Sequence, residues 1–159
     1  EKMLNEYLQF ASKRSSEKTE KFDISELIFN TINKYENKNI IFKSNSKIIF
    51  TGRKDLIRRC LNNFIDNSIK YGKNIVVNIK KGSNNLTITI DDDGPGIEKK
   101  YYENVFKPFY KIDKSRGDAK SSVGLGMSIA SDIVQSHGGS IKLEKSDLNG
   151  LRVKISLPF

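Results

Sequence analysis

The sequence predicts an α/β (α+β) sandwich, in which one mixed, mostly antiparallel sheet is packed on one face by about three helices. Three observations support this class. Segments with the alternating pattern of strands are interspersed with segments of helical periodicity. Each helical segment has one apolar side to bury against the sheet. The chain has 159 residues, enough for one domain with a real hydrophobic core.

The chain opens inside an expected helix over residues 1–14, so it reads as a piece of a longer protein. The apolar side chains of this helix fall on one side, at Leu4, Tyr7, Leu8 and Ala11. Such a stripe needs a partner helix. Residues 15–21 are polar and charged without periodicity and are expected to form a linker. The main domain is therefore expected to cover residues 22–159.

The main domain is expected to begin with a helix. Asp23 and Glu26 have the spacing of a capping box, and the helix should run to about Tyr35. Two short apolar segments follow, at 40–42 and 48–50. They predict either a hairpin or two short strands.

The clearest helix covers residues 53–71, where apolar side chains recur every three or four positions. Residues 75–80 and 86–91 alternate as strands around a turn rich in Gly, Ser and Asn. An Asp- and Gly-rich turn and a short helix near 98–105 come next. The polar stretch 107–123 has no period, and a loop of this length in a compact domain is usually functional.

The C-terminal part is expected to hold a helix over 126–136, ended by Gly138 and Gly139. Two strands, 140–145 and 151–156, should close the fold.

Composition excludes several classes of protein. A single cysteine excludes a disulfide within the chain, and with a single histidine it excludes a zinc site of the usual kind. Cys60 is expected to be a core thiol. No apolar segment is long enough for a bilayer, so this segment is expected to be soluble. The net charge of +9 comes mostly from scattered lysines. Solvated lysines explain it better than nucleic-acid binding, although a general attraction to polyanions stays open.

Three elements could carry chemistry, and each also has a plain structural interpretation. The first is a stripe along the helix 53–71 formed by Asn63, Asn67, Lys70 and Tyr71. It could be a solvated polar edge. Two asparagines one turn apart, however, lower helix propensity without adding charge. An amide oxygen is also a suitable ligand for hydrated Mg²⁺, and a lysine could contact a phosphate.

The second element is the turn that follows the strand 86–91. Three carboxylates compete there, at positions 91–93, and counting back from Gly94 and Gly96 selects Asp92. A surface turn would favour the same residue types. A carboxylate at a strand end can accept a hydrogen bond from an exocyclic amine, and glycines let the backbone approach a flat base.

The third element is the sequence Gly-Leu-Gly-Met at positions 124–127, ahead of a helix. A glycine loop that opens a helix offers N–H groups and a positive dipole end to phosphate. It matches neither the Rossmann fingerprint nor the Walker loop.

Together, these elements resemble the sensor histidine kinases. The stripe from Asn63 to Tyr71 resembles their N box, Asp92 to Ile97 the G1 box, Phe106 to Lys111 the F box, and Val123 to Met127 the G2 box. The resemblance covers roughly residues 22–159. It implies a Bergerat-type ATP-binding fold that uses Mg²⁺. The short lid is similar to that of the osmosensor type.

The resemblance also implies a role for each matching residue. Asn67 would hold Mg²⁺ with support from Asn63, Lys70 would lie near the phosphates, and Tyr71 would pack by the base. Asp92 would recognise the adenine amine. The remaining ATP-binding residues would be Gly94, Gly96 and Ile97 at the base pocket, Phe106, Phe109 and Lys111 in the lid, and Val123, Gly124, Leu125 and Gly126 by the phosphates.

Two positions depart from the family pattern. Ser122 stands where many members have the first glycine of the G2 box. Lys111 replaces the commoner arginine, which turns a bidentate grip on phosphate into a point-charge contact.

The family transfers the γ-phosphoryl of ATP to a histidine on a dimerisation hairpin, for relay to a response-regulator aspartate. Residues 1–14 resemble the end of that hairpin, and its phosphoacceptor helix is expected to be absent here. His137, the single histidine, reads as a residue at a helix C-terminus in a favourable dipole position. No catalytic residue is assigned, and the segment alone is expected not to phosphorylate itself. The resemblance further implies a full-length homodimer, a cytoplasmic domain of a bacterial inner-membrane sensor, and no nucleic-acid partner.

Other interpretations remain. The chain could be another ATPase of the same superfamily, such as a gyrase-like, chaperone-like or mismatch-repair domain or an anti-sigma serine kinase. It could also be a non-catalytic scaffold or polyanion-binding module with a degenerate pocket.

Overall fold

The structure is a computed structural model that describes residues 2–36, 39–44, 46–112 and 125–159. In chain order the helices and strands are α1 (Lys2–Ser16), β1 (Glu20–Asp23), α2 (Ile24–Ile32), β2 (Asn39–Lys43), β3 (Ile49–Gly52), α3 (Lys54–Tyr71), β4 (Asn74–Lys81), β5 (Asn85–Asp92), α4 (Gly126–Ser136), β6 (Ser140–Lys145) and β7 (Leu151–Pro158).

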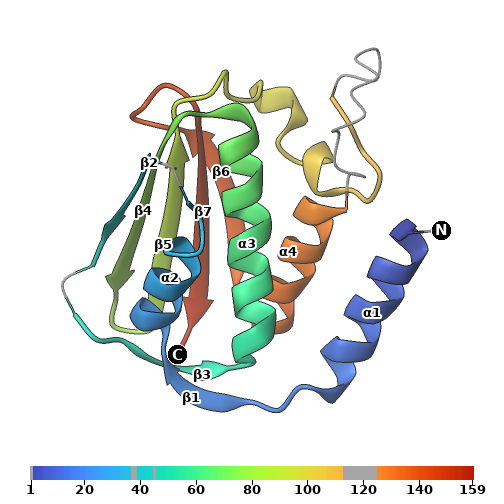
Figure 1. The fold of residues 1–159 in the computed structure, drawn as a ribbon, viewed down its shortest axis with the longest axis vertical. Coiled ribbons are helices and arrows are strands. Elements are labelled where there is room, and N and C mark those ends of the chain that lie inside the picture. Colours follow the sequence, from blue (N-terminus) through green and yellow to red (C-terminus); the bar gives the residue numbers. More distant parts are fainter. Residues whose placement is uncertain (1, 37–38, 45, 113–124) are drawn as a thin grey trace.

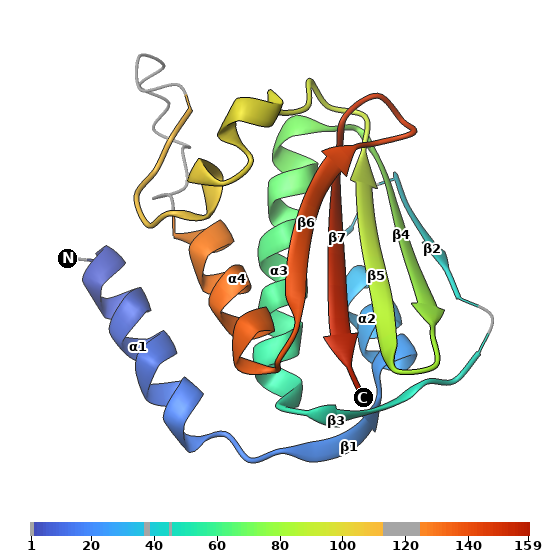
Figure 2. The same cartoon turned by 180° about the vertical axis from the view of Figure 1, so that it is seen from behind.

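One main sheet and one layer of helices form the body of the molecule. The sheet has the strand order β2-β4-β5-β7-β6. Strands β2 and β4 pair in parallel, and the other neighbours are antiparallel. Helices α2, α3 and α4 cover one face, and the described chain leaves the other face open (Figures 1 and 2). The predicted sandwich with a mixed sheet and helices on one face is therefore confirmed.

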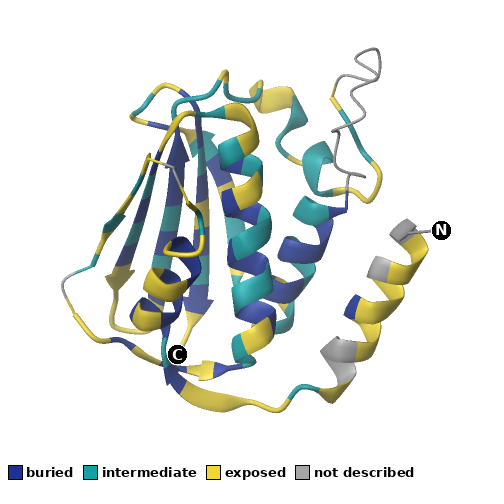
Figure 3. Cartoon of the chain, viewed as in Figure 1, coloured by how far each residue is buried: buried dark blue, intermediate teal, exposed yellow. Residues whose placement is uncertain are grey.

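The core lies between the sheet and the helices, where buried residues of both layers face one another (Figure 3). In β5, the central strand of the sheet, Leu86, Ile88 and Ile90 are buried because alternate side chains of a strand point to the same face. Ile88 pairs with Ile79 of β4 on one side and with Ile155 of β7 on the other. The predicted core thiol is confirmed, since Cys60 is 2% exposed and donates to the Ala130 carbonyl at 3.7 Å.

A small second sheet was not predicted. β1 pairs with β3 in antiparallel register, and the Phe22 and Phe50 rings meet edge to face at 5.9 Å between centroids. The expected linker 15–21 is therefore partly wrong as secondary structure, because α1 extends to Ser16 and β1 starts at Glu20.

Asp23 caps α2, as predicted. Its Oδ1 accepts from the Ser25 amide at 3.0 Å and from the Ile48 amide at 3.2 Å. The helix ends at Ile32, one turn earlier than expected. The two apolar segments that follow form β2 and β3, which belong to different sheets, so the hairpin alternative is wrong.

Helix α1 lies beside the sandwich (Figure 1). Its apolar stripe is exposed. Leu4 is 63% exposed, and Leu8 and Tyr7 are exposed as well. Phe10 is buried instead, under the Arg59 guanidinium at 5.5 Å from the ring centroid. No helix in the described ranges is long and apolar enough to cross a membrane.

The segment between α1 and β1 is tied to the start of α3. Glu17 Oε1 accepts from the Asp55 amide at 2.6 Å, and Oε2 accepts from the Leu56 amide at 3.1 Å. The residue at the N-cap position of α3, Arg53, makes no capping hydrogen bond with its side chain. Glu17 therefore caps this helix from outside, where a carboxylate also interacts favourably with the helix dipole.

His137 joins the end of α4 to the start of α3. Its Nε2 accepts from the Arg53 amide at 3.1 Å, so Nδ1 carries the proton and donates to the Ile133 carbonyl at 2.8 Å. The expected position at a helix C-terminus is confirmed. Burial nevertheless lowers the pKa of His137 below 6.5, against a smaller opposing effect of the Ile133 hydrogen bond. Neutral His137 therefore connects the two helices by hydrogen bonds, and it does not act as a cation at the C-terminal end of the α4 dipole.

The cap on α3 predicts a loss of stability when Glu17 becomes glutamine. A glutamine offers one acceptor in place of two and carries no charge, so Glu17→Gln should lower the free energy of unfolding by about 1 kcal/mol. Urea denaturation measures this, with Glu20→Gln on exposed β1 as the control. Equal stability of the two variants would contradict the capping role.

The neutral state of His137 predicts a pH dependence. Because its folded pKa lies below 6.5, the unfolded state takes up the proton more readily. The stabilisation is thus complete above about pH 6.5 and is lost as the pH falls through the folded pKa. Unfolding at pH 7.5 and 5.5 should show a loss that His137→Gln, at a cost of about 1 kcal/mol at neutral pH, largely removes. An equal loss in both proteins would contradict this.

Candidate functional site

The polar stripe of α3 is present and contacts α4. Asn63 is half-buried and its Nδ2 donates to the Gly126 carbonyl at 3.2 Å. Because Gly126 is the first residue of α4, this bond joins the first predicted element to the third.

The other polar residues of the stripe remain available to a ligand. Asn67 is half-buried, and its side chain makes no hydrogen bond to a described residue. Lys70 is exposed, with its Nζ 5.3 Å from the centroid of the Tyr71 ring, and Tyr71 is 54% exposed at the end of α3.

Asp92 ends β5 on the side of the sheet that faces the helices. It lies two residues after buried Ile90 and is 3% exposed. Its Oδ1 accepts from the amides of Gly94 at 2.9 Å and Leu151 at 3.1 Å. Its Oδ2 has no partner in the described chain. Since every fully buried side-chain N or O atom described has a partner, this oxygen keeps an open side.

The two neighbouring carboxylates are committed elsewhere. Asp91 points to the outer face, where its Oδ1 accepts from Ser146 and from Arg152. Asp93 accepts from the Lys73 amide at 2.7 Å and from the Asn74 amide and side chain. These bonds, led by that of the Asn74 amide, lower the pKa of Asp93. Asp92 is therefore the carboxylate of the three with an oxygen left for a ligand on the helix side.

The glycines after Asp92 bring the turn against the end of α3. A Cβ on Gly94 would lie 2.7 Å from the Tyr71 carbonyl oxygen, closer than real contacts allow. Gly96 has φ of +72°, a conformation that favours glycine. Ile97 packs on the core. The first two predicted elements thus meet at Gly94.

The expected short helix near 98–105 consists of two 3₁₀ turns, Lys99–Tyr101 and Asn104–Phe106. Phe106 packs against the core, as its expected anchoring role requires. Phe109 is 59% exposed with φ of +63°, so no burial supports the same role for it. Lys111 is half-buried.

The start of α4 is suited to an anion. Leu125 is buried and provides no side-chain cap, so the first amides of α4 have no acceptor within the helix. Among the described residues, a Cβ on Gly126 would meet no heavy atom within 4 Å. Val123 and Gly124, like Ser122, lie outside the described residues.

Gly150 and Leu151 complete the site and were missed as site residues. A Cβ on Gly150 would lie 2.2 Å from Asp92 Oδ1, and the Gly150 amide donates to the Asp92 carbonyl at 3.1 Å. The sequence shows this segment only as the turn between the last two strands. Within the described ranges, no three His, Cys, Asp or Glu side chains are grouped to hold a metal ion.

Comparison with known proteins agrees with this geometry. Residues 52–159 match the family described as histidine kinase-, DNA gyrase B-, and HSP90-like ATPase. The sensor histidine kinase CpxA of Escherichia coli K12 is 37% identical over 109 residues, which are 68% of this chain and 24% of CpxA. WalK of Bacillus subtilis 168, another sensor histidine kinase, is 36% identical over 110 residues, covering 66% and 18% of the two chains.

Solved structures show the same fold. The mycobacterial sensor histidine kinase MprB superposes with a TM-score of 0.76 at 22% identity, over 89% of this chain and 97% of the other. The chain spans about a quarter of the length of CpxA. It belongs to the histidine kinase-, DNA gyrase B- and HSP90-like ATPase family, as an ATP-binding catalytic domain of the sensor histidine kinase type.

Proposed function

We propose that this domain binds Mg-ATP between the end of β5, α3 and the start of α4, and donates the γ-phosphoryl group to a histidine on a separate hairpin of the full-length protein. The observation that carries the proposal is the buried carboxylate of Asp92, with one oxygen held by two amides and the other without a partner. An exocyclic amine is the donor that such an oxygen lacks.

The base would lie beside Asp92, with its amine on Oδ2. Gly94 and Gly96 allow a flat ring to approach the backbone, and Ile97 and Tyr71 offer apolar surface. The discrimination would come from the carboxylate, because a buried acceptor rejects a base that cannot donate to it.

The phosphates would lie toward the start of α4. The open amides near Leu125 and Gly126 would bind them, together with the predicted residues Val123 and Gly124. Lys70 and Lys111 would contribute positive charge as point contacts.

Mg²⁺ would be held by the Asn67 amide oxygen and the phosphates. The bond between Asn63 and Gly126 supports this arrangement, because it sets the distance between the N-box helix and the phosphate end of α4. When bound, the ion supplies neutralisation of the phosphate charge.

The full-length protein is proposed to be a homodimer whose hairpin carries the phosphoacceptor histidine and whose partner is a response regulator. The exposed stripe with Leu4 and Leu8 on α1 supports a missing partner helix. The domain would lie on the cytoplasmic side of a bacterial inner membrane, anchored by other parts of the protein. His137 is not proposed as the phosphoacceptor, since both of its ring nitrogens are engaged in the fold.

The alternatives find less support. CpxA and WalK are both named as sensor histidine kinases, which disfavours the gyrase-like and chaperone-like members of the superfamily. A degenerate scaffold is disfavoured because the Asp92 carboxylate is held by two amides, and Gly94 and Gly150 leave room for the backbone to pack around it. No nucleic-acid partner is proposed.

Calorimetry with a non-hydrolysable ATP analogue tests the base and metal sites. Asp92→Asn should weaken binding at least tenfold with or without Mg²⁺, because it replaces a charged acceptor (~1.5–3 kcal/mol). Asn67→Ala should weaken only the Mg²⁺-dependent part of the affinity, and chelation should abolish its difference from wild type.

Neighbouring substitutions serve as controls. Asp93→Asn and Asn62→Ala lie next to the two sites but face away from the proposed ligand, since Asp93 binds Lys73 and Asn74, and Asn62 accepts from Tyr35. Both should bind the analogue like wild type. Equal losses in the control and test variants would contradict the assignments.

Phosphotransfer is a separate expectation. The chain incubated with labelled ATP should gain no acid-labile phosphohistidine, whereas the full-length protein should. His137→Gln should leave the full-length reaction intact. Phosphohistidine on the chain alone that disappears in His137→Gln would overturn this part of the proposal.

A further inference from the structure

The two adjacent carboxylates at the end of β5 point to opposite faces of the sheet, but both contact the turn between β6 and β7. Asp92 faces the proposed base pocket. Asp91 faces outward, is 5% exposed and takes no part in the proposed binding of nucleotide. A buried carboxylate needs a compensating partner, so its surroundings define what it does.

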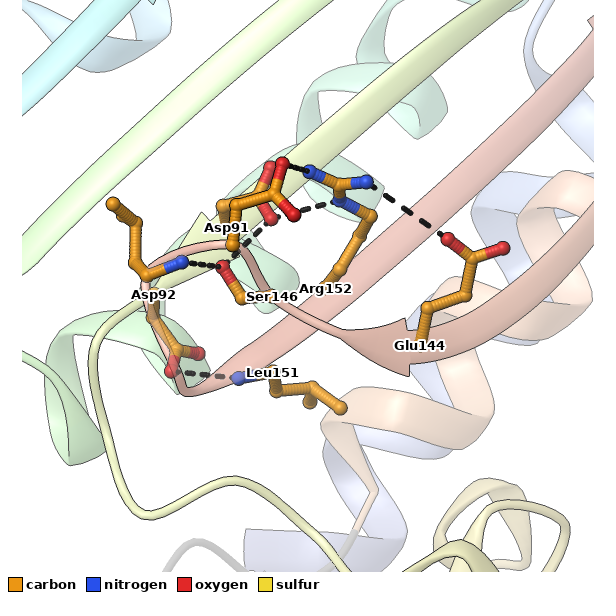
Figure 4. Close-up of polar contacts among 8 residues, drawn as sticks. Asp91, Asp92, Glu144, Ser146, Leu151 and Arg152 are labelled. Carbon is orange, nitrogen blue, oxygen red and sulfur yellow. Dashed lines mark hydrogen bonds and ion pairs between the residues drawn. The ribbon is translucent and has the colours of Figure 1, made fainter.

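Arg152 is the main partner of Asp91. Its Nε donates to Asp91 Oδ1 at 2.8 Å, and its other guanidinium nitrogens reach Asp147 at 3.0 Å and Glu144 at 4.0 Å (Figure 4). The hydrogen bond to Asp91 is the largest contribution to the raised pKa of Arg152. Arg152, at the start of β7, therefore connects the end of β6 and the β6–β7 turn to Asp91 of the central strand β5.

Ser146 adds a second link from the turn to β5. Its hydroxyl donates to Asp91 Oδ1 at 2.8 Å and accepts from the Leu148 amide at 3.0 Å. Asp91 thus fixes the turn at Ser146 and at Arg152, the residues on either side of positions 147–151.

The same turn reaches Asp92 on the other face. The Gly150 amide donates to the Asp92 carbonyl. The Leu151 amide donates to Asp92 Oδ1 at 3.1 Å (Figure 4). A Cβ added to Gly150 would lie 2.2 Å from that oxygen, so the backbone of the turn packs directly against the Asp92 carboxylate. Displacement of the turn would remove one of the two donors that orient the carboxylate.

We infer that Arg152 and Ser146 are positioning residues for adenine recognition, which act by holding the β6–β7 turn so that the Leu151 amide fixes the Asp92 carboxylate with Oδ2 toward the base. This inference rests on the proposed role of Asp92. Removal of Arg152 would leave a buried carboxylate without its counter-charge, and the turn would rearrange to hydrate it. Water can reach this carboxylate from the open face of the sheet, because Asp91, Asp147 and Arg152 line a hollow of about 600 Å³ there.

The test compares ATP with the triphosphate of purine riboside, which lacks the exocyclic amine. Calorimetry on the wild-type domain should show a preference for ATP of roughly tenfold or more. In Arg152→Gln the ratio of the two affinities should fall close to one, because the affinity for ATP falls while the affinity for the amine-free nucleotide stays nearly unchanged. Arg152→Lys should retain part of the preference, because it keeps the charge but has one nitrogen in place of the three that contact Asp91, Asp147 and Glu144.

Two further variants separate positioning from general damage. Lys154→Gln lies on the same strand and lines the same hollow, with no ion pair to a described residue, and should keep the full preference. Ser146→Ala leaves the ion pair in place and should reduce the preference less than Arg152→Gln does. In the Asp92→Asn background, Arg152→Gln should have no further effect on the preference.

The outcomes distinguish the two proposals. If wild type shows no preference and Asp92→Asn changes nothing, the role of Asp92 is wrong and the inference falls with it. If wild type prefers ATP but folded Arg152→Gln and Ser146→Ala keep that preference, or lose affinity equally for both nucleotides, the inference alone is overturned. Amide exchange gives an independent readout, since Leu151 should lose protection in Arg152→Gln and keep it in Lys154→Gln.

Discussion

The site depends on the alternation of side chains along β5 at the point where the strand ends. Because neighbouring residues of a strand face opposite sides, Asp91 and Asp92 cannot share an environment. One enters a network with Arg152 on the open face, and the other enters the helix layer with a free oxygen. The alternation of side chains along the strand thus separates a carboxylate held in an ion-pair network from one that keeps an oxygen without a partner.

The helix that bounds the site is fixed at both ends. Glu17 and His137 hold the start of α3, and the close contact of Gly94 with the Tyr71 carbonyl holds its end. In the middle, Asn63 connects it to the first residue of α4. The asparagines that would approach the metal and phosphates therefore lie on a helix whose position is set by the sheet, by α4 and by the segment that leads in from α1.

Much of the fold and of the site could be predicted because their signals lie in side chains. The order of apolar and polar residue types along the chain carries these signals. It gives the periodicity of α3 and α4, the alternation in β4 and β5, and the cap at Asp23. The choice of Asp92 from the glycine spacing agrees with the face on which the strand places it. The strand β1 was missed because its four residues include two exposed charges, and its strand conformation depends on pairing with β3 and on the packing of Phe22.

Other parts could not be read because they use backbone groups or long-range contacts. The Leu151 amide has no signature in residue type, and Gly150 is distinguished only by a contact made across the sheet. The cap by Glu17 on α3 spans 38 positions of sequence. Phe109 shows the converse, since an aromatic residue in a recognised motif is exposed in this structure.

A crystal structure of the domain with a non-hydrolysable ATP analogue and Mg²⁺ would test the central claim most directly. The adenine amine should lie about 2.7–3.2 Å from Asp92 Oδ2, with the Leu151 amide still donating to Oδ1. A base bound elsewhere, such as in the hollow beside Asp91 on the open face, or a nucleotide beside Asp92 whose amine donates to another group, would contradict it.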